Sequence, residues 1–302
     1  MSELVQLTPR SGGPKASRKP DWLRIRYRET PKLHRLFGLV SELELNTVCS
    51  SAACPNLPEC WSRGTATFMI GGNLCTRRCG FCDVRTGRPE SLDPTEPARV
   101  AEAIERLGLR FAVLTAVARD DLPDGGAAHF AASLRRIRER SPDCRVEVLI
   151  PDLKGCETAL RTVLDAEPDV MNHNLETVSR LQRRVRPQGS YARSLGVLSA
   201  AARIRPDIPV KTGIMLGLGE TEPEVLRALA DVRETGCTLI TIGQYLRPGA
   251  EHLPVARYLE PAEFEAWEVR ARALGFRDVA SGPLVRSSYR AERLAGAFAA
   301  RS

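Results

Sequence analysis

From Thr65 onward the chain alternates between short β-rich runs and amphipathic stretches, and this alternation restricts its fold more than any other feature. The strand-like runs are Thr65–Ile70, Phe111–Val117, Arg145–Ile150, Val170–Asn174, Val210–Leu216 and Leu239–Leu246. The helix-like stretches are Glu96–Leu107, Ala128–Arg140, Glu157–Leu164, Ser190–Arg203, Pro223–Thr235 and Pro261–Leu274. In the first of these, Val100, Ile104 and Leu107 recur at spacings of four and three, which is typical of a helix packed on a sheet. Six strand–helix units predict right-handed crossovers and a parallel sheet.

Because a closed barrel needs eight such units, we expect an α/β fold built as a partial, TIM-like (βα)6 barrel. A flatter, doubly wound sheet is the alternative that periodicity leaves open. A last strand-like run, Asp278–Val285, leads into Arg286–Tyr289 and a closing helix. We therefore divide the chain into a polar, disordered tail (1–20), a cysteine-rich N-terminal extension (21–63), the barrel (64–276) and a C-terminal extension (277–302).

Six of the nine cysteines fall within one short stretch, in two triplets of different spacing. The triplets are Cys49-x4-Cys54-x5-Cys60 and Cys75-x3-Cys79-x2-Cys82. A cubane iron–sulfur cluster normally takes four cysteines, so each triplet is one thiolate short. Such a cluster keeps one iron open to another ligand. The two incomplete sets therefore indicate chemistry rather than a structural staple.

The second triplet begins just after the first predicted strand, at the end of the sheet where active sites of such folds form. Gly71 and Gly72 would let the backbone turn sharply there, and Phe81 would shield the neighbouring thiolate from water. A structural zinc site is the plain alternative. Zinc needs four ligands, and the four histidines lie far away in sequence, which disfavours it.

Charge and hydropathy restrict the setting of the protein. The net charge is +7, with 44 basic and 37 acidic residues. This excess suggests an acidic partner or simply a solvated basic surface. The first twenty residues contain no apolar stretch typical of a signal, and no run approaches a membrane span. We therefore expect a cytoplasmic protein with reduced thiols.

The second triplet resembles the signature of the radical S-adenosylmethionine superfamily, with its x3 and x2 spacing and an aromatic residue before the last cysteine. The resemblance implies that the open iron binds the cofactor, whose reductive cleavage releases a 5′-deoxyadenosyl radical. Polar residues at the fourth strand end and a glycine-containing segment after the fifth strand are candidate cofactor contacts. They are Asn172, Asn174, Glu176, Gly213, Gly217 and Glu220. A structural polar network and packing glycines are the alternatives.

Six segments in fixed order resemble the lipoyl synthase family. They are TVCSSAACPNLPECW, GGNLCTRRCGFCDV, ARDDLPDGG, HNLET, QYLRP and RSSY. The resemblance implies that Cys49, Cys54 and Cys60 hold an auxiliary 4Fe–4S cluster with Ser288 as its fourth ligand. It also implies sulfur insertion at C6 and C8 of a lysine-bound octanoyl chain, with the auxiliary cluster consumed as donor. Ser288 and the second triplet would be the catalytic residues; without the motif, Ser288 would be taken for a helix cap.

The same resemblance implies partners. They are an octanoylated lipoyl carrier domain (a 2-oxoacid dehydrogenase subunit or the glycine cleavage H protein), an electron donor such as ferredoxin or flavodoxin, and an iron–sulfur carrier protein. We expect no nucleic-acid or membrane partner. A biotin synthase-like enzyme or a methylthiotransferase is the nearer rival. A zinc-bearing nucleic-acid-binding protein, suggested by pI ≈ 9.1, is disfavoured because aromatic residues make up only 5% of the chain.

Overall fold

The computed structural model describes residues 19–24, 31–47, 56, 59–60, 64–289 and 291–292. Side chains at 31–33 and 36 are outside this description. Most of the tail for which disorder is predicted, residues 1–18, lies outside the described residues, as do Cys49 and Cys54. The other four cysteines of the two triplets, Cys60, Cys75, Cys79 and Cys82, lie within the described residues, as does Ser288. The division into tail, extensions and barrel stays a prediction.

One sheet of eight strands forms the centre of the molecule, and its strands lie side by side in chain order. The strands are β1 (Asn46–Thr47), β2 (Thr65–Ile70), β3 (Phe111–Ala116), β4 (Arg145–Leu149), β5 (Val170–Asn172), β6 (Val210–Leu216), β7 (Leu239–Gln244) and β8 (Asp278–Gly282). All neighbours from β2 to β8 pair in parallel, while β1 is antiparallel to β2. A doubly wound sheet would reverse its strand order at a switch point. The unreversed order confirms the partial barrel.

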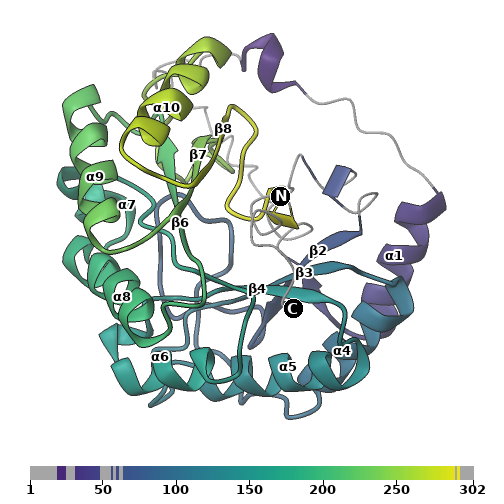
Figure 1. Ribbon diagram of the computed structural model, residues 1–302. Coiled ribbons are helices and arrows are strands. Elements are labelled where there is room, and N and C mark those ends of the chain that lie inside the picture. Colours follow the sequence, from purple (N-terminus) through teal and green to yellow (C-terminus); the bar gives the residue numbers. More distant parts are fainter. Residues whose placement is uncertain are drawn as a thin grey trace, which may run out of the picture.

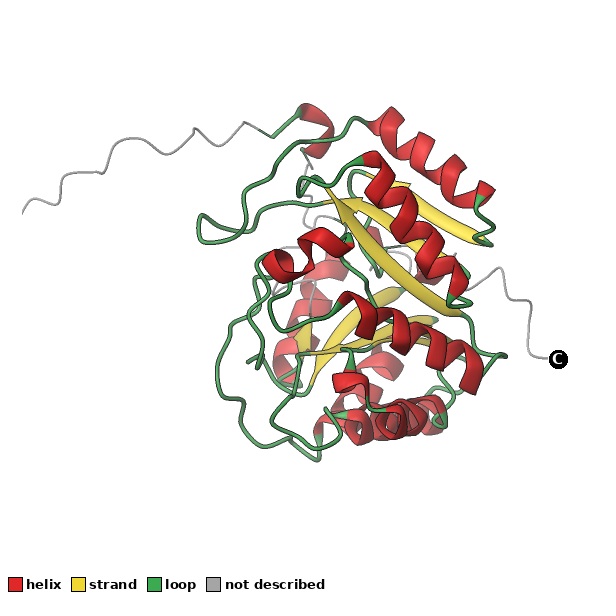
Figure 2. Ribbon diagram, turned by 90° about the vertical axis from the view of Figure 1, so that its left-hand side faces the viewer, coloured by secondary structure: helices red, strands yellow, loops and turns green. Residues whose placement is uncertain are grey.

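Helices cover the outer side of this sheet (Figure 1). They are α1 (Pro31–Glu42), α4 (Glu96–Leu107), α5 (Ala127–Arg140), α6 (Glu157–Leu164), α7 (Gln182–Val185), α8 (Tyr191–Ile204), α9 (Glu222–Glu234) and α10 (Pro261–Ala273). Three 3-10 turns occupy Asp21–Leu23, Leu153–Gly155 and Ser179–Leu181. The ribbon in Figure 2 shows the long loops gathered toward one side of the strands. No helix among the described residues combines the length and the apolarity that crossing a bilayer requires.

Local sequence explains where several helices begin and end. Thr221 and Glu224 form a capping box at the start of α9, and Glu260 and Glu263 do the same for α10. Each of these boxes satisfies backbone N–H groups that the first helical turn leaves free. Gly108 ends α4 in the left-handed conformation, with φ of 58°. These signals are why the predicted helix boundaries agree with the structure to within about two residues.

Strand residues are buried on both faces, as expected for a sheet with helices outside and a filled interior. All six residues of β2 and all six of β7 are buried. At the amino ends of the strands, Phe111, Val170 and Leu239 pack with Ala291 of the C-terminal extension. Thr65 at the start of β2 also donates a hydrogen bond to Glu292 (3.2 Å). Residues 291–292 therefore lie near the amino-terminal ends of these strands.

Candidate active site at the carboxyl ends of the strands

The segment between β2 and α4, residues 71–95, carries the second cysteine triplet and is called the cysteine loop below. It begins at Gly71 and Gly72, whose φ angles of 80° and 97° favour glycine. The loop then folds on itself, because the Cys75 N–H donates to the Arg85 carbonyl (2.8 Å) and the Gly87 N–H donates to the Cys75 carbonyl (3.0 Å). The cysteines thus lie at the carboxyl end of the sheet, in the position predicted from the sequence.

The three thiols of the loop differ in their surroundings. Cys75 Sγ accepts from the backbone N–H groups of Arg77 (3.4 Å) and Ala118 (3.3 Å). Burial raises the pKa of Cys79 to about 12 and that of Cys82 to about 11. In the metal-free protein these two thiols therefore stay protonated at neutral pH. Metal binding has to displace their protons, so occupancy of the site is coupled to pH.

The spacing of these sulfurs tests which metal group the loop fits. The three Sγ atoms do not all lie within 4.8 Å of one another. A single tetrahedral zinc with bonds of about 2.3 Å would hold its sulfurs about 3.8 Å apart. The wider arrangement fits the corners of a multi-iron cluster better than one ion. The donor set of three half-buried thiols with one position left over is therefore suited to a 4Fe–4S cluster.

Arg77, between two of the cysteines, fixes the loop to the ends of β3 and β4. Its guanidinium is 7% exposed and pairs with both oxygens of Asp120 (2.7 Å each) and with Asp152 Oδ1 (2.6 Å). Burial alone would raise the pKa of Asp152, but the Arg77 guanidinium lowers it to about 2. Arg77, Asp120 and Asp152 thus form a clamp of fixed charges under the triplet.

The residue before Asp120 holds the two flanks of the same loop. Arg119 is buried and donates to the carbonyls of Gly71 (3.0 Å) and Glu90 (2.8 Å). Glu96 accepts from the Gly71 N–H (2.8 Å) and contacts His129 Nε2 (2.6 Å). Arg119 also pairs with Asp121 (2.8 Å), so both Arg119 and Asp120 form ion pairs within the protein.

A cavity of about 350 Å³ opens beside Cys82 at the carboxyl ends of β6 and β7. Its lining comes from the cysteine loop, the segment after β5, strands β6 and β7, and the C-terminal extension, and includes Phe81, Cys82, Asn174, Glu176, Gly213, Thr241, Arg286 and Ser287. Segments that lie far apart in the chain thus line one cavity, next to one of the three thiols.

The polar groups of this cavity are arranged for a ligand with N–H or O–H groups. Asn174 donates to Glu176 Oε1 (3.1 Å), and its own Oδ1 is buried with no hydrogen-bond partner in the described part of the chain. Burial raises the pKa of Glu176, which Arg186 partly opposes. A Cβ built on Gly213 would lie 2.8 Å from Asn174 Oδ1 and 2.7 Å from Thr241 Oγ1, so glycine keeps this space open. An unpaired acceptor and a desolvated carboxylate fit a cationic cofactor such as S-adenosylmethionine.

The other candidate cofactor residues do not line this cavity. Asn172 is fully buried and donates to Glu147 (2.7 Å), which also pairs with Lys211 (2.8 Å). Glu220 accepts from the N–H groups of Gly217 (2.6 Å) and Leu218 (2.9 Å), closing the loop after β6. Direct cofactor contact by Asn172, Gly217 and Glu220 stays a prediction.

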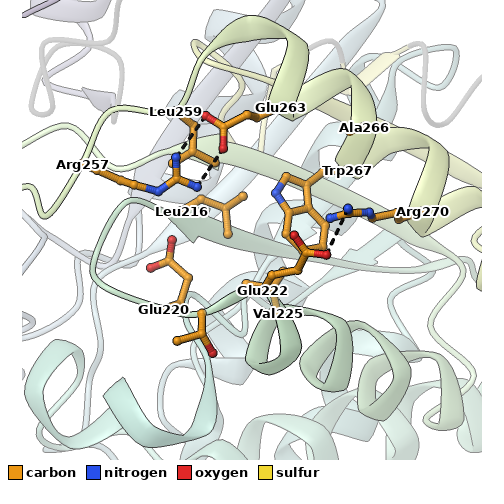
Figure 3. Close-up of a pocket in the computed structure, with 11 residues that line it drawn as sticks. Leu216, Glu220, Glu222, Val225, Arg257, Leu259, Glu263, Ala266, Trp267 and Arg270 are labelled. Atoms are coloured by element: carbon orange, nitrogen blue, oxygen red, sulfur yellow. Dashed lines mark hydrogen bonds and ion pairs between the residues drawn. The ribbon is translucent and has the colours of Figure 1, made fainter.

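Glu220 instead borders a smaller pocket of about 140 Å³ beside α9 and α10 (Figure 3). Two ion pairs lie along this pocket, Arg257 with Glu263 (2.8 Å) and Arg270 with Glu222 (3.0 Å). The guanidinium of Arg270 also lies over the ring of Trp267, 4.8 Å from its centre. The main charges of this pocket are therefore already paired, and it is a weaker candidate for ligand binding than the cavity beside Cys82.

Side-chain hydrogen bonds connect the described parts of the two chain extensions. Asn56 donates to the Leu284 carbonyl (2.6 Å), and the Tyr289 hydroxyl donates to Glu59 (3.0 Å). Cys60 follows Glu59 and Ser288 precedes Tyr289, so one cysteine of the first triplet and the serine of RSSY come into the same region. Cys49 and Cys54 lie outside the described residues. Ser287, next to Ser288, lines the cavity that Cys82 also lines.

Sequence reasoning assigned no role to Gln244 of QYLRP, which proves to organise this end of the barrel. Its buried amide Nε2 donates to the carbonyls of Leu216, Tyr245 and Arg257 (3.1 Å each), and its Oε1 accepts from the Leu259 N–H (2.9 Å). A glutamine at the end of a buried strand was the only available signal. The neighbouring Gly243 is required because a Cβ there would lie 2.1 Å from the Val285 carbonyl oxygen.

Comparison with known proteins agrees with this geometry. The family model of the Radical SAM superfamily matches residues 69–232. The fold is similar to that of SuiB from Streptococcus suis bound to S-adenosylmethionine (TM-score 0.57, 9% identity, 72% of this chain and 50% of that one). It is also similar to HydG, a maturase of the FeFe-hydrogenase (TM-score 0.55, 14% identity, 89% and 68%). The fold and the cysteine loop therefore define a radical S-adenosylmethionine enzyme, a class that uses a 4Fe–4S cluster and S-adenosylmethionine.

Closer relatives specify the family within that class. The chain is 54% identical to a lipoyl synthase of Rubrobacter xylanophilus, over 90% of this chain and 85% of the relative. It is also 54% identical to a lipoyl synthase of Thermus thermophilus, over 91% and 86%. The chain belongs to the lipoyl synthase family, which confirms the resemblance found in the sequence.

Proposed function

We propose that this chain inserts sulfur at C6 and C8 of an octanoyl group that is amide-linked to a lysine of a lipoyl carrier domain. The observation that carries the proposal is that one cavity is lined both by Cys82 of the second triplet and by Ser287, the neighbour of Ser288. An acyl chain in this cavity would lie between the two metal sites. One site would activate its carbons and the other would supply sulfur.

In this proposal Cys75, Cys79 and Cys82 hold the first 4Fe–4S cluster. Together with S-adenosylmethionine, that cluster supplies the one-electron chemistry that removes hydrogen from carbons too unreactive for acid–base catalysis. Asn174 and Glu176 bind the cofactor's polar groups, and Gly213 leaves room for it. The other three candidates support the cofactor site indirectly, because they hold the ends of β5 and β6 in place. They are Asn172, Gly217 and Glu220.

The first triplet, Cys49, Cys54 and Cys60, would hold the auxiliary 4Fe–4S cluster with Ser288 as fourth ligand. A serine oxygen is a harder ligand than a thiolate and suits this soft group less well. The serine corner is therefore the one most easily released when sulfur leaves. Support comes from the contact between the extensions, which brings Cys60 and Ser288 into one region.

The cavity offers apolar surface to the reacting carbons. Its lining includes the apolar side chains of Phe81, Ile214, Met215, Leu246 and Val285. These surfaces suit an octanoyl chain, which gains from leaving water. Beyond the carrier domain, we propose an electron donor such as flavodoxin or ferredoxin and an iron–sulfur carrier protein as partners.

Anaerobic reconstitution tests the proposal. We expect about eight irons per chain, from two cubanes, and lipoyl product on an octanoylated carrier peptide. Ser288→Ala should keep cleavage of S-adenosylmethionine but lose the lipoyl product. Iron for one cluster only would remove the auxiliary role. Cofactor cleavage by the wild type without lipoyl product would favour a different radical enzyme.

A further inference from the structure

Three exposed arginines beside the cysteine loop form no ion pair with any described residue. They are Arg78 on the loop and Arg183 and Arg184 on α7, and they are called the arginine surface below. Many exposed arginines elsewhere on the molecule are paired with carboxylates, among them Arg106 with Glu42 (2.8 Å) and Arg203 with Glu157 (2.6 Å). Exposed positive charges without carboxylate partners, grouped on one surface, suit an acidic macromolecule.

Short α7 presents its two arginines on a fixed backbone. Its end residues, Gln182 and Val185, are buried, so the two middle residues face outward. Gln182 donates to the Leu175 carbonyl (2.8 Å). Arg186, just after the helix, is buried and donates to the Asn174 carbonyl (3.1 Å) and Ser194 Oγ (3.2 Å). The surface is therefore built on the same framework that positions Asn174 in the cavity.

Direct backbone contacts join this surface to the triplet. The Gly80 N–H, next to Cys79, donates to the Val185 carbonyl (2.8 Å), and the Arg78 N–H donates to Gln188 Oε1 (3.3 Å). A Cβ built on Gly80 would lie 3.4 Å from the Arg184 carbonyl oxygen and 2.8 Å from Leu253 Cγ. The chain that bears Arg183 and Arg184 thus packs against the loop between Cys79 and Cys82.

The arginine surface is separate from the cavity lining. None of its three residues lines the cavity, whose basic lining residues are Lys19, Arg247 and Arg286. A carrier domain has to deliver its acyl chain into the cavity and would therefore meet those residues. A protein that delivers only an electron needs no entry to the cavity; it needs the shortest path through protein to the thiolates.

We propose that the arginine surface docks an acidic one-electron donor protein of the flavodoxin or ferredoxin kind. The inference rests on the proposed function, because radical chemistry at Cys75, Cys79 and Cys82 requires one electron per cofactor cleaved. The reduced donor loses that electron and the cluster held by these thiolates gains it, with no bond formed between the proteins. Positive charges beside the loop steer an acidic donor to the segment that is hydrogen-bonded to the loop between Cys79 and Cys82.

The test reverses two charges. We compare Arg183→Glu/Arg184→Glu with a matched control, Arg135→Glu/Arg227→Glu, which changes two exposed arginines on α5 and α9. Calorimetric titration of the reconstituted proteins with flavodoxin gives Kd at about 0.05 M and about 0.2 M salt. We expect the Kd of the test variant to rise at least about tenfold at low salt, with a weaker salt dependence, and that of the control to match wild type.

Turnover provides the second readout. With flavodoxin as reductant, kcat/KM for flavodoxin should fall at least about tenfold in the test variant. With dithionite, which needs no docking, lipoyl formation should equal that of wild type.

An unchanged Kd for flavodoxin would overturn the inference. A raised KM for the octanoylated carrier under dithionite would also overturn it, because the surface would then dock the carrier. Absence of lipoyl product from wild type under dithionite would instead contradict the proposed function, while the Kd comparison would still report on the surface.

Discussion

The cysteine loop and the region around Cys60 and Ser288 are built in different ways. The loop is tied to the barrel by a buried clamp, by Arg119 on both flanks and by backbone hydrogen bonds to Ala118, Val185 and Leu253. In the other region, hydrogen bonds from Asn56 and Tyr289 connect the described parts of the two extensions. One site is part of the barrel, whereas the other joins two ends of the chain.

This difference suggests how each site acquires its metal. The barrel positions three thiols before any iron arrives, so the loop needs little ordering on binding. The second region joins two ends of the chain that lie far apart in sequence, so we infer that the auxiliary cluster itself contributes part of the free energy that joins them.

Removal of one ligand from each site gives the largest expected contrast. Cys79→Ala should abolish cleavage of S-adenosylmethionine and lower reconstituted iron from about eight to about four per chain. Ser288→Ala should leave cofactor cleavage intact, alter the auxiliary Mössbauer signal and abolish lipoyl product. Iron counting, Mössbauer spectroscopy and analysis of both the cofactor-cleavage products and the lipoyl product under anaerobic conditions measure these four quantities.

Cys237→Ala is a control for the loss of a thiol as such, since Cys237 is buried and outside both triplets. It should keep both Mössbauer signals. An unchanged auxiliary signal in Ser288→Ala would contradict the proposed serine ligand, and loss of both clusters in Cys79→Ala would show that the sites are not independent.

The sequence predicted the position of the cysteine loop, but it did not predict the contact between the two chain extensions. Strand–helix periodicity placed all seven parallel strands, and the loop after the first of them carried a recognisable triplet. The sequence could not show which polar side chains at the end of β5 point into the cavity and which point away from it. Asn172 turns to Glu147, His173 turns to Ser194 (3.0 Å), and Asn174 lines the cavity. Those directions depend on neighbouring strands and helices, which local sequence does not contain.

Long-range contacts were also beyond prediction. Nothing near Asn56 indicates that it binds a carbonyl 228 residues away. The two-residue β1, paired antiparallel to β2, and the short α7 were missed because neither is long enough to show a period.

A second contrast removes the clamp of the cysteine loop. Arg77→Ala leaves Asp120 and Asp152 without their cation, and we expect the free energy of unfolding of the metal-free protein to fall by about 3–5 kcal/mol. Arg77→Lys keeps the charge but cannot form the bidentate pair, so its loss should be smaller. Denaturant titration followed by circular dichroism measures both.

Arg106→Ala, which breaks an exposed ion pair with Glu42, is the control and should have little effect. Equal stabilities of Arg77→Ala and Arg106→Ala would show that the backbone alone holds the loop.

Acid should destabilise the barrel through His173. Burial and then the charge of Arg186 lower the pKa of His173 from 6.5 to about 4. The unfolded chain therefore binds more protons than the folded one between these pH values, and stability is lost as pH falls from 6.5 toward 4. The lost free energy is about 3 kcal/mol.

His173→Gln should remove this part of the pH dependence, measured as the difference between unfolding free energies at the two ends of the range. If the acid-induced loss belongs to the barrel, Ser288→Ala should show the same loss as wild type. A wild-type loss no larger than that of His173→Gln would contradict the assignment to this imidazole.

The smallest expected effect tests the contact between the extensions directly. Tyr289→Phe removes one hydroxyl that donates to Glu59 (3.0 Å) and should weaken the joined state by about 1 kcal/mol. Because about 1 kcal/mol corresponds to roughly a fivefold change in an equilibrium, iron of the auxiliary cluster should be lost to a chelator roughly fivefold faster.

The matched control is Tyr191→Phe, which removes a hydroxyl bond to Asp231 (2.8 Å) between α8 and α9. It should leave the rate of iron loss unchanged, and neither substitution should affect the iron held by the cysteine loop. If both variants released auxiliary iron at the wild-type rate, the extensions would have to be held together by contacts other than the Tyr289 bond, and the two sites would differ less in how they are held.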